Sequence, residues 1–389
     1  MGQQKKLLFV CYGLGIGGIE RCLVNLLNIL PEDEFDVDLL VLNPKYALKD
    51  QIRRKVNFLD AFSYIYNTEF TMGEIRKRGG LWKYRRMLLP YLDHRVRIKL
   101  GLPLWTTFRP LEKHYDVAVA YSQNGLAPYY VADKVTADRK VLWYHNGAYE
   151  KTGKDYALDR QYYPKFDYVV TVSRYCEEML WERFPCLREK TLVLYNICDS
   201  KSVLRGAEAF FPEGFSGEAA HIVTVGRLAP EKGPELALEA CRLLREEGRK
   251  IVWHWVGDGP MMKKARAEVI RLGLEDCFRL EGDQTNPYPY MKYAKIYVQP
   301  SYYESYSATV SEAMVLCKPI VITGVGGMRD RLADGVTGRI VPVSAQALAE
   351  AIGQLLDSEE TARRYSDNLQ QEVIGGGQEL EAYRKTVFA

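Results

Sequence analysis

The chain opens with a strand, a glycine-rich loop and a helix in direct succession, because residues 7–30 read LLFVCYGLGIGGIERCLVNLLNIL. The first five of these residues form a short apolar run typical of a buried strand, and the residues from Ile19 to Leu30 have apolar side chains at helical spacing. Glycines fill the loop between them. A strand, a tight turn and a helix in this order form one βα unit, the building block of a doubly wound parallel sheet.

The same alternation of strand-like and helical patterns continues along all 389 residues. In the first half, the strand-like runs are residues 7–11, 37–42, 56–59, 117–121, 141–144, 168–172 and 192–195. In the second half, they are residues 222–225, 251–256, 278–280, 296–299, 320–323 and 339–343. Each set is typical of one parallel sheet covered by helices on both faces. The sequence therefore predicts an α/β protein with two Rossmann-like doubly wound domains.

The domain boundary is expected where the periodic patterns stop. Residues 200–219 contain prolines, glycines and serines and show no sustained period. We expect an N-terminal domain at residues 1–200, a linker at 201–219 and a C-terminal domain at 220–375. The last segment, residues 376–389, is expected to pack back toward the N-terminal domain.

Composition excludes several classes of protein. A net charge of +3 over this length does not indicate nucleic acid as a partner. The eight cysteines form no Cys-x-x-Cys pair and no cluster with histidine, so neither a structural metal nor a disulfide framework is indicated. No apolar stretch is long enough to cross a membrane or to act as a signal peptide. We expect a cytoplasmic location, with a peripheral position on the inner face of the cell membrane as an alternative.

One segment of the first half, residues 76–99, is strongly basic. Its cations are interleaved with leucine, methionine, tryptophan and tyrosine. The cations are Arg76, Lys77, Arg78, Lys83, Arg85, Arg86, Arg95, Arg97 and Lys99. Such a pattern is typical of an interfacial helix on an anionic membrane surface, and equally of a solvated helix whose apolar face packs on its own domain. Both interpretations stay open.

The glycines of the first loop match G-x-G-x-x-G, a pattern typical of dinucleotide-binding oxidoreductases. Such a site needs an acidic residue at the end of the second strand to hold the ribose, whereas residues 37–42 are followed by Asn43 and Pro44. We therefore favour a loop near the phosphate or sugar of a ligand, with Gly17 and Gly18 close to it. A tight turn with close helix packing is the alternative.

A second loop carries two cations. Residues 225–233 read VGRLAPEKG, so Arg227 and Lys232 lie between a predicted strand and a helix that Pro234 opens. A planar guanidinium and an ammonium near a helix N-terminus are suited to a diphosphate. A solvent-facing loop with incidental charges is the alternative.

Two glutamates, Glu304 and Glu312, lie eight residues apart around a predicted helix start. If the intervening residues were helical, the backbones would be roughly 12 Å apart at about 1.5 Å per residue, farther than the paired carboxyl groups of glycosidases. This separation favours contacts with two ends of one elongated ligand. Two glutamates on a helix surface are the alternative.

Two further features were weighed as candidate sites. Asp36 and Asp38 resemble a metal-binding Asp-x-Asp pair, but they lie at the start of a predicted strand, which favours a structural role. His145 ends a strand-like run, where catalytic loops emerge in open α/β sheets. A structural histidine is the alternative there.

Taken together, these motifs resemble the family 4 retaining glycosyltransferases, which have the GT-B fold. The resemblance implies that the two Rossmann-like domains face each other across a cleft. The resemblance covers nearly the whole chain. It is carried by Gly17-Gly18-Ile19-Glu20, Asn196 with Asp199, Gly226-Arg227-Leu228 with Glu231-Lys232-Gly233, Val256 to Pro260, Glu304 with Glu312, and Gly326-Gly327.

The resemblance implies a role for each candidate residue. Arg227 and Lys232 would bind the donor diphosphate, Glu304 the donor sugar and Glu312 the nucleotide ribose. His145 would lie near the reacting sugar carbon. The donor-binding set is Gly17, Gly18, Arg227, Lys232, Glu304, Ser305, Tyr306, Ser307 and Glu312. The chain departs from the family at Asp330, where glutamate is common, and at Ser305 and Ser307, where glycines are common.

The function expected from the resemblance is transfer of a hexose from a nucleotide-diphosphate sugar to a glycan or lipid-linked acceptor, with retention of configuration and without metal or cofactor. Surface polysaccharide assembly is the expected setting. The N-terminal domain would bind the acceptor and the C-terminal domain the nucleotide sugar. The alternatives are a non-catalytic nucleotide-sugar-binding protein and a phosphorylase or epimerase of the same fold.

Overall fold

The computed structural model describes residues 4–15, 17–43, 46–59, 103–147, 149, 151–372 and 376–389. The chain divides into two compact units. The N-terminal unit comprises Met1–Val172, Cys176–Leu194 and Glu379–Ala389, and the C-terminal unit comprises Ser173–Tyr175 and Tyr195–Gln378. The basic segment at residues 76–99 lies outside the described residues, so its two interpretations stay predictions.

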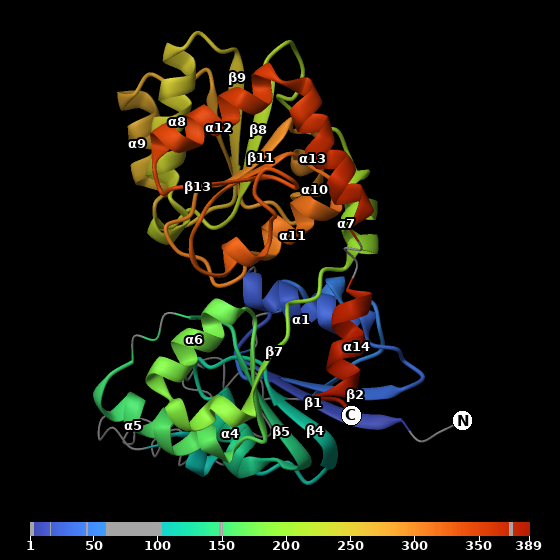
Figure 1. Cartoon of the computed structure of the whole chain (residues 1–389). Helices are drawn as coiled ribbons and strands as arrows, with labels where there is room; N and C mark the ends of the chain where they lie inside the picture. The colour runs from blue at the N-terminus through green and yellow to red at the C-terminus, as the bar shows by residue number, and fades with distance from the viewer. Residues whose placement is uncertain are drawn as a thin grey trace, which may run out of the picture. The chain divides into compact units, whose positions relative to one another are not determined.

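The N-terminal unit contains a parallel sheet with the strand order β3-β2-β1-β4-β5-β6-β7 (Figure 1). Its strands are β1 (Lys5–Cys11), β2 (Phe35–Val41), β3 (Asn57–Leu59), β4 (His114–Ala120), β5 (Thr136–Tyr144), β6 (Tyr168–Thr171) and β7 (Thr191–Val193). Each strand-like run predicted for the first half forms one of these strands, and the order reverses beside β1 as in a doubly wound sheet.

Helices cover this sheet. They are α1 (Gly18–Ile29), α4 (Ala127–Lys134), α5 (Gly153–Tyr162), α6 (Arg174–Arg183) and α14 (Gly377–Lys385). The residues from Leu7 to Cys11 of β1 are all buried, and Leu8 and Val10 share one core with Tyr129 and Tyr130 of α4. Phe9 points to the opposite face, because side chains alternate along a strand. A strand buried on both faces explains why residues 7–11 are continuously apolar.

The C-terminal segment forms part of the N-terminal unit, and α14 lies beside β1 and β2 in Figure 1. The ring of Phe388 lies 6.2 Å from that of Phe9 and 5.9 Å from that of Phe35. The ammonium of Lys5 donates to the Phe388 carbonyl at 3.1 Å, and the Arg139 guanidinium donates to the Thr386 carbonyl at 2.9 Å. The last residues of the chain thus complete the second face of the first sheet.

The C-terminal unit contains a parallel sheet with the order β10-β9-β8-β11-β12-β13. Its strands are β8 (Ala220–Val225), β9 (Ile251–Val256), β10 (Phe278–Gly282), β11 (Ile296–Gln299), β12 (Ile320–Thr323) and β13 (Arg339–Val341). Every run predicted for the second half forms one strand. The predicted fold class, two Rossmann-like parallel-sheet domains, is therefore confirmed.

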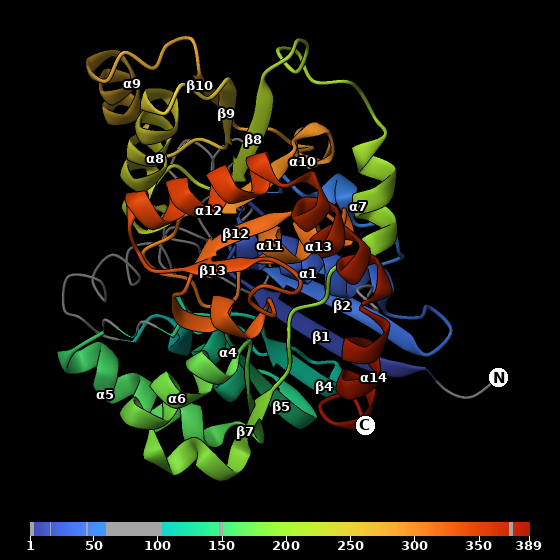
Figure 2. The ribbon, with the colours of Figure 1, turned by 45° about the horizontal axis from the view of Figure 1, so that its top comes forward.

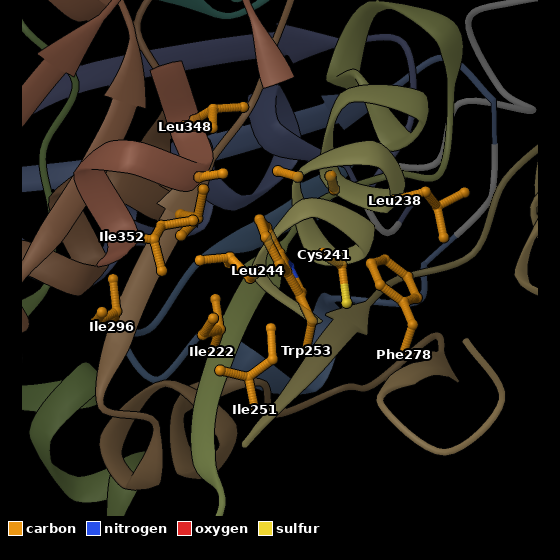
Figure 3. Packing of buried hydrophobic residues seen from close by; sticks show 14 of the residues in the cluster. Ile222, Leu238, Cys241, Leu244, Ile251, Trp253, Phe278, Ile296, Leu348 and Ile352 are labelled. Atoms are coloured by element: carbon orange, nitrogen blue, oxygen red, sulfur yellow. The ribbon is translucent and has the colours of Figure 1, made fainter. Parts of the chain in front are cut away.

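Two cores cover the faces of this sheet. Its helices are α7 (Ser200–Ala207), α8 (Pro234–Glu246), α9 (Met262–Arg271), α10 (Tyr288–Tyr293), α11 (Ala308–Val315), α12 (Ala345–Asp357) and α13 (Glu359–Gln371). Ile222 and Trp253 belong to the core that packs against α8, α9 and α12 (Figure 3). These three helices lie beside one another in both ribbon views (Figures 1 and 2). Val223, the next residue of β8, belongs to the other core with α10 and α11.

One helix was not predicted from the sequence. Residues 200–219 showed no sustained period, yet residues 200–207 form helix α7. The Asp199 carboxylate caps this helix by accepting from the Ser202 backbone N–H at 3.0 Å, and Val203 and Ala207 are buried. A cap and two buried side chains were enough to form two helical turns, although so short a pattern was not visible in the sequence.

Candidate functional site

Several loops meet at the carboxyl ends of adjacent strands in the C-terminal unit. They are residues 226–233 after β8, 257–259 after β9, 300–307 after β11 and 324–330 after β12, and together we call them the loop cluster. Backbone hydrogen bonds join them: Leu228 donates to Asp258 at 2.9 Å, Tyr302 to Glu231 at 2.9 Å, and Gly327 to Glu304 at 3.1 Å. Motifs far apart in the sequence therefore form one surface at the end of the sheet where ligands bind in this class of fold.

The paired glycines Gly326 and Gly327 allow two loops of this cluster to touch. A Cβ atom on Gly326 would lie 1.9 Å from the Glu304 carbonyl oxygen, and one on Gly327 would lie 2.1 Å from that of Ser305. Gly326 also has a φ of +49°, which other residues rarely adopt. These glycines hold the segment that carries Glu304.

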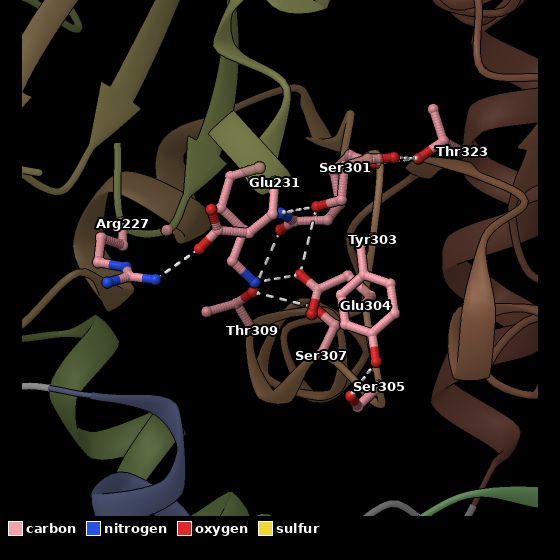
Figure 4. Close-up of polar contacts among 12 residues, drawn as sticks. Arg227, Glu231, Ser301, Tyr303, Glu304, Ser305, Ser307, Thr309 and Thr323 are labelled. Atoms are coloured by element: carbon pink, nitrogen blue, oxygen red, sulfur yellow. Dashed lines mark hydrogen bonds and ion pairs between the residues drawn. The ribbon is translucent and has the colours of Figure 1, made fainter. Parts of the chain in front are cut away.

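Lys232 and Glu304 form an ion pair in the loop cluster, with 2.5 Å between the Nζ atom and the Oε1 atom (Figure 4). Their side chains are 23% and 8% exposed. The sequence motifs assign these residues to different parts of the donor and do not reveal their contact, because 72 residues separate them. No local pattern signals such a pairing.

Arg227, the second cation of the β8 loop, is paired differently. Its Nη2 atom lies 2.5 Å from Oε1 of Glu231, and its side chain is 65% exposed. Burial raises the pKa of Glu231, but hydrogen bonds from its own backbone and from Arg227 outweigh this effect and the net shift is downward. An exposed ion pair contributes little to stability, so Arg227 can turn toward an incoming anion at small cost.

Glu312 lies in α11 and is buried, and its Oε1 accepts from the Tyr288 hydroxyl at 3.1 Å. Helix α11 begins only at Ala308, so residues 304–307 are not helical and the assumption behind the 12 Å estimate was wrong. The two carboxylates lie in different settings, because that of Glu304 contacts Lys232 of the β8 loop and that of Glu312 accepts from the Tyr288 hydroxyl. The ribose role of Glu312 stays a prediction.

The segment after Glu304 has an unusual backbone. Ser307 has a φ of +63°, in the left-handed region that favours glycine, and it immediately precedes α11. This conformation explains why glycine is common at this position in the family that the chain resembles. Tyr306 donates to the Asn196 carbonyl at 3.0 Å and lies under the Arg331 guanidinium at 4.5 Å. Asp330 is exposed at the end of the 324–330 loop.

The N-terminal unit has a cavity of about 250 Å³ at the carboxyl ends of β1 and β4. Its lining residues are Cys11, Tyr12, Gly13, Ile19, Glu20, Leu23, Tyr121, Ser122, Asn124 and Gly125. Burial raises the pKa of the Glu20 carboxyl. Gly17 and Gly18, which were predicted to lie near a ligand, are at the start of α1, where Gly17 is the N-cap. Glu20 was part of a sequence motif but was not predicted to line a site. Ser122 and Asn124 were not predicted either, because β4 and β1 are neighbours only in the folded sheet.

His145 follows β5 directly and is buried, with its ring 4.8 Å from that of Tyr121. Its backbone N–H donates to the Gln123 side chain at 3.0 Å. Its Nε2 atom has no hydrogen-bond partner among the residues that the structure describes. Burial lowers the pKa of His145 from 6.5 to about 3. The imidazole is therefore neutral at neutral pH.

A buried neutral histidine makes stability depend on pH. Between pH 6.5 and 3 the unfolded chain binds the proton that folded His145 excludes, so the contribution is complete above pH 6.5 and is lost as pH falls. From pH 7 to pH 5, the free energy of unfolding of the wild type should fall by about 2 kcal/mol more than that of His145→Gln. Urea denaturation at both pH values measures the difference. Equal pH dependence in the two proteins would show that His145 titrates normally.

Asp36 and Asp38 lie within β2 and not in a loop after a strand. The Asp38 carboxylate accepts from the Tyr115 hydroxyl at 2.7 Å and pairs with Lys113 at 3.1 Å. These contacts fit the structural role favoured from the sequence.

Comparison with known proteins identifies the family. The family description "Glycosyltransferase Family 4" matches residues 16–201, and "Glycosyl transferases group 1" matches residues 207–372. The chain belongs to glycosyltransferase family 4. The first match ends at residue 201 and the second begins at residue 207, so the interval between them lies within α7.

Individual relatives are named as glycosyltransferases. The chain is similar to the N-acetylgalactosamine-N,N'-diacetylbacillosaminyl-diphospho-undecaprenol 4-alpha-N-acetylgalactosaminyltransferase of Campylobacter jejuni. The two are 24% identical over 366 residues, and the match covers 93% of each protein. The chain is 32% identical over 150 residues to the alpha-D-kanosaminyltransferase of Streptomyces kanamyceticus, but this match spans 38% of the chain and 39% of that relative.

Solved structures share the GT-B fold of family 4. HepE from Anabaena, in complex with UDP and glucose, superimposes with a TM-score of 0.73 at 17% identity, over 99% of this chain and all of that one. At this identity the likeness shows the fold. No helix among the described residues has the length and apolar character needed to span a bilayer.

Proposed function

We propose that this family 4 protein is a retaining, metal-independent glycosyltransferase that moves a hexose from a nucleoside-diphosphate sugar to a glycan or lipid-linked acceptor. The observation that carries the proposal is the Lys232–Glu304 pair in the loop cluster, which joins a cation for the leaving diphosphate to a carboxylate for the sugar. The name of the Campylobacter relative supports a lipid-linked acceptor, and the HepE complex supports a UDP-sugar donor.

The chemistry follows from charge. As the bond between sugar and diphosphate breaks, negative charge grows on the diphosphate oxygens, so a cation there stabilises the transition state more than the ground state. Lys232 would exchange its bond to Glu304 for a bond to the diphosphate, and Arg227 would leave Glu231 in the same way. Glu304 would then face the sugar, where positive charge develops, and Glu312 would hold the ribose.

The acceptor would use the N-terminal unit. Its cavity offers groups that hydrogen-bond to sugar hydroxyls, among them Glu20, Ser122 and Asn124. Neutral His145 would provide a hydrogen-bonding group near the reacting carbon without adding charge, consistent with its lowered pKa. Gly17 and Gly18, at the start of α1, would lie close to the donor phosphate.

The direct test is transfer itself. A panel of nucleotide sugars is first screened for thermal stabilisation, because a ligand that binds only the folded state raises its stability. The best donor is then incubated with a glycan or undecaprenol-diphosphate-linked acceptor, and NMR of the product reports the anomeric configuration. Retained configuration supports the proposal, and inversion contradicts the retaining mechanism. Donor binding without hydrolysis or transfer would favour the alternative, a non-catalytic nucleotide-sugar-binding protein.

Metal independence predicts the effect of a chelator. Because Lys232 and Arg227 can neutralise the diphosphate, transfer should continue in excess EDTA at a rate close to that of the untreated protein. The rate is measured before and after dialysis against EDTA, and again with added Mg²⁺ or Mn²⁺. Complete loss of activity, restored by one of these ions, would contradict the prediction.

A peripheral position on the membrane is a second prediction, carried by the composition of residues 76–99. Each Lys or Arg close to an anionic surface contributes about 1 kcal/mol, so a few engaged residues would hold the protein weakly. Vesicles with increasing anionic lipid should sediment the wild type at low salt and release it at high salt. Arg85→Glu/Arg86→Glu should bind less. Equal binding by both proteins would favour the packed-helix interpretation.

A further inference from the structure

A chain of hydrogen bonds runs along β11 beneath the loop cluster and ends at Glu304. The Tyr297 hydroxyl donates to Oε1 of Gln299 at 2.6 Å, and Nε2 of Gln299 donates to the Ser301 hydroxyl at 3.0 Å. The Ser301 hydroxyl in turn donates to Oε1 of Glu304 at 3.3 Å. Tyr297, Gln299 and Ser301 are completely buried. We call Tyr297, Gln299, Ser301 and Glu304 the β11 relay.

The direction of the relay is set at Gln299. Its Oε1 atom accepts two hydroxyl hydrogens, from Tyr297 and from Thr309 at 3.2 Å. Burial raises the pKa of Tyr297, so its phenol keeps its proton. An amide has one acceptor end and one donor end, so the donor end must face Ser301. Ser301 thus receives a hydrogen bond and keeps its own hydrogen for Glu304 (Figure 4).

The relay matters most when Lys232 is engaged elsewhere. Glu304 is nearly buried, and Lys232 also contacts its Oε1 atom. A buried carboxylate that loses its cation keeps its position only if hydrogen-bond donors remain. Once Lys232 turns to a diphosphate, the Ser301 hydroxyl is the donor left on Oε1 among the contacts that the structure describes.

We propose that Gln299 is a positioning residue for sugar transfer, which acts through Ser301 to hold the Glu304 carboxylate in place while Lys232 binds the leaving diphosphate. This inference rests on the proposed function of Lys232 and Glu304. Gln299 need not touch either substrate, because its side chain is completely buried on β11.

The test uses two near-isosteric variants. Gln299→Met keeps the length of the side chain and removes both polar ends, and Gln299→Glu keeps the acceptor for Tyr297 and Thr309. An ionised glutamate cannot donate to Ser301, whereas the neutral acid can. Both variants should have a kcat about 10- to 100-fold lower than the wild type, with donor KM nearly unchanged, as when an outer hydrogen-bond partner of a site residue is removed.

A pH series separates positioning from a loss of packing. Burial raises the pKa of a carboxyl placed at residue 299, so it is neutral at low pH and ionises as pH rises. Tyr297 contacts residue 299 directly, the charges of Glu304 and Glu312 act on Tyr297, and Lys232 pairs with Glu304. The ratio of wild-type to Gln299→Glu kcat should therefore increase with pH, whereas the ratio for Gln299→Met should stay constant. Ser301→Ala should lose activity to a similar degree as Gln299→Met.

Thr224→Val is the matched control. Thr224 is completely buried on the neighbouring strand β8 and donates to the Val298 carbonyl at 2.8 Å, outside the β11 relay. The Thr224→Val variant should be less stable than the wild type and have the same kcat. If both Gln299 variants fold and have wild-type kcat while Glu304→Gln is impaired, the inference is overturned and the proposed function stands. If Glu304→Gln has wild-type kcat, the role of Glu304 fails, and the inference fails with it.

Discussion

Lys232→Ala is expected to lower kcat by about 10² to 10³, the usual effect of removing one preorganised group that stabilises charge in a transition state. The structure gives this expectation a second basis. The Lys232 ammonium lies 2.5 Å from Glu304, and the Glu304 side chain is only 8% exposed. Removing the cation takes away the group for the diphosphate and leaves Glu304 without its ionic partner.

The loss of the partner also affects folding. A carboxylate left buried without its cation destabilises a protein, so Lys232→Ala should unfold at a lower temperature. Kinetics are therefore measured well below the melting temperature. Glu304→Gln in the Lys232→Ala background should restore stability but not activity, since the amide needs no counterion. Lys264→Ala, which breaks an exposed ion pair with Glu235, is the control and should keep both. A Lys232→Ala protein that turns over like the wild type would refute the diphosphate role.

Gly327→Ala is expected to reduce kcat about 10²-fold, because a displacement of about 1 Å in a catalytic group has effects of this size. The added Cβ atom would lie 2.1 Å from the Ser305 carbonyl oxygen. A backbone oxygen cannot rotate away as a flexible side chain can, so the loop that carries Glu304 must shift. Binding of a nucleoside diphosphate through Lys232 should be affected less than the transfer step.

Gly335→Ala separates this effect from general strain. Gly335 has a φ of +73°, but a Cβ atom there would meet nothing within 4 Å. This variant should lose about 1 to 2 kcal/mol of stability through backbone strain and keep wild-type kcat. Transfer by Gly327→Ala at the wild-type rate would mean that the Glu304 loop tolerates displacement. The precise position of Glu304 would then be unimportant for the reaction.

Much of the fold could be predicted because a buried strand shows as a local run of apolar residues in the sequence. A strand covered on both faces must be apolar at successive positions, so runs such as residues 7–11 and 320–323 mark strands without knowledge of their neighbours. The glycine and cation motifs could be found because they follow these runs directly, and ligands bind beyond the carboxyl ends of strands. Helix α7 was missed, because two turns held by one cap and two buried residues leave too short a pattern.

The sequence by itself therefore determined the two parallel-sheet domains, the family and the loops that carry Arg227, Lys232, Glu304 and Glu312. Only the tertiary structure decided which of these groups touch. Lys232 meets Glu304 across 72 residues because β8 and β11 are neighbours in the sheet. Gln299 lies within an apolar strand, and its link to Glu304 depends on the orientation of one buried amide. Such contacts arise from sheet order and close packing, and neither leaves a periodic signal in the sequence.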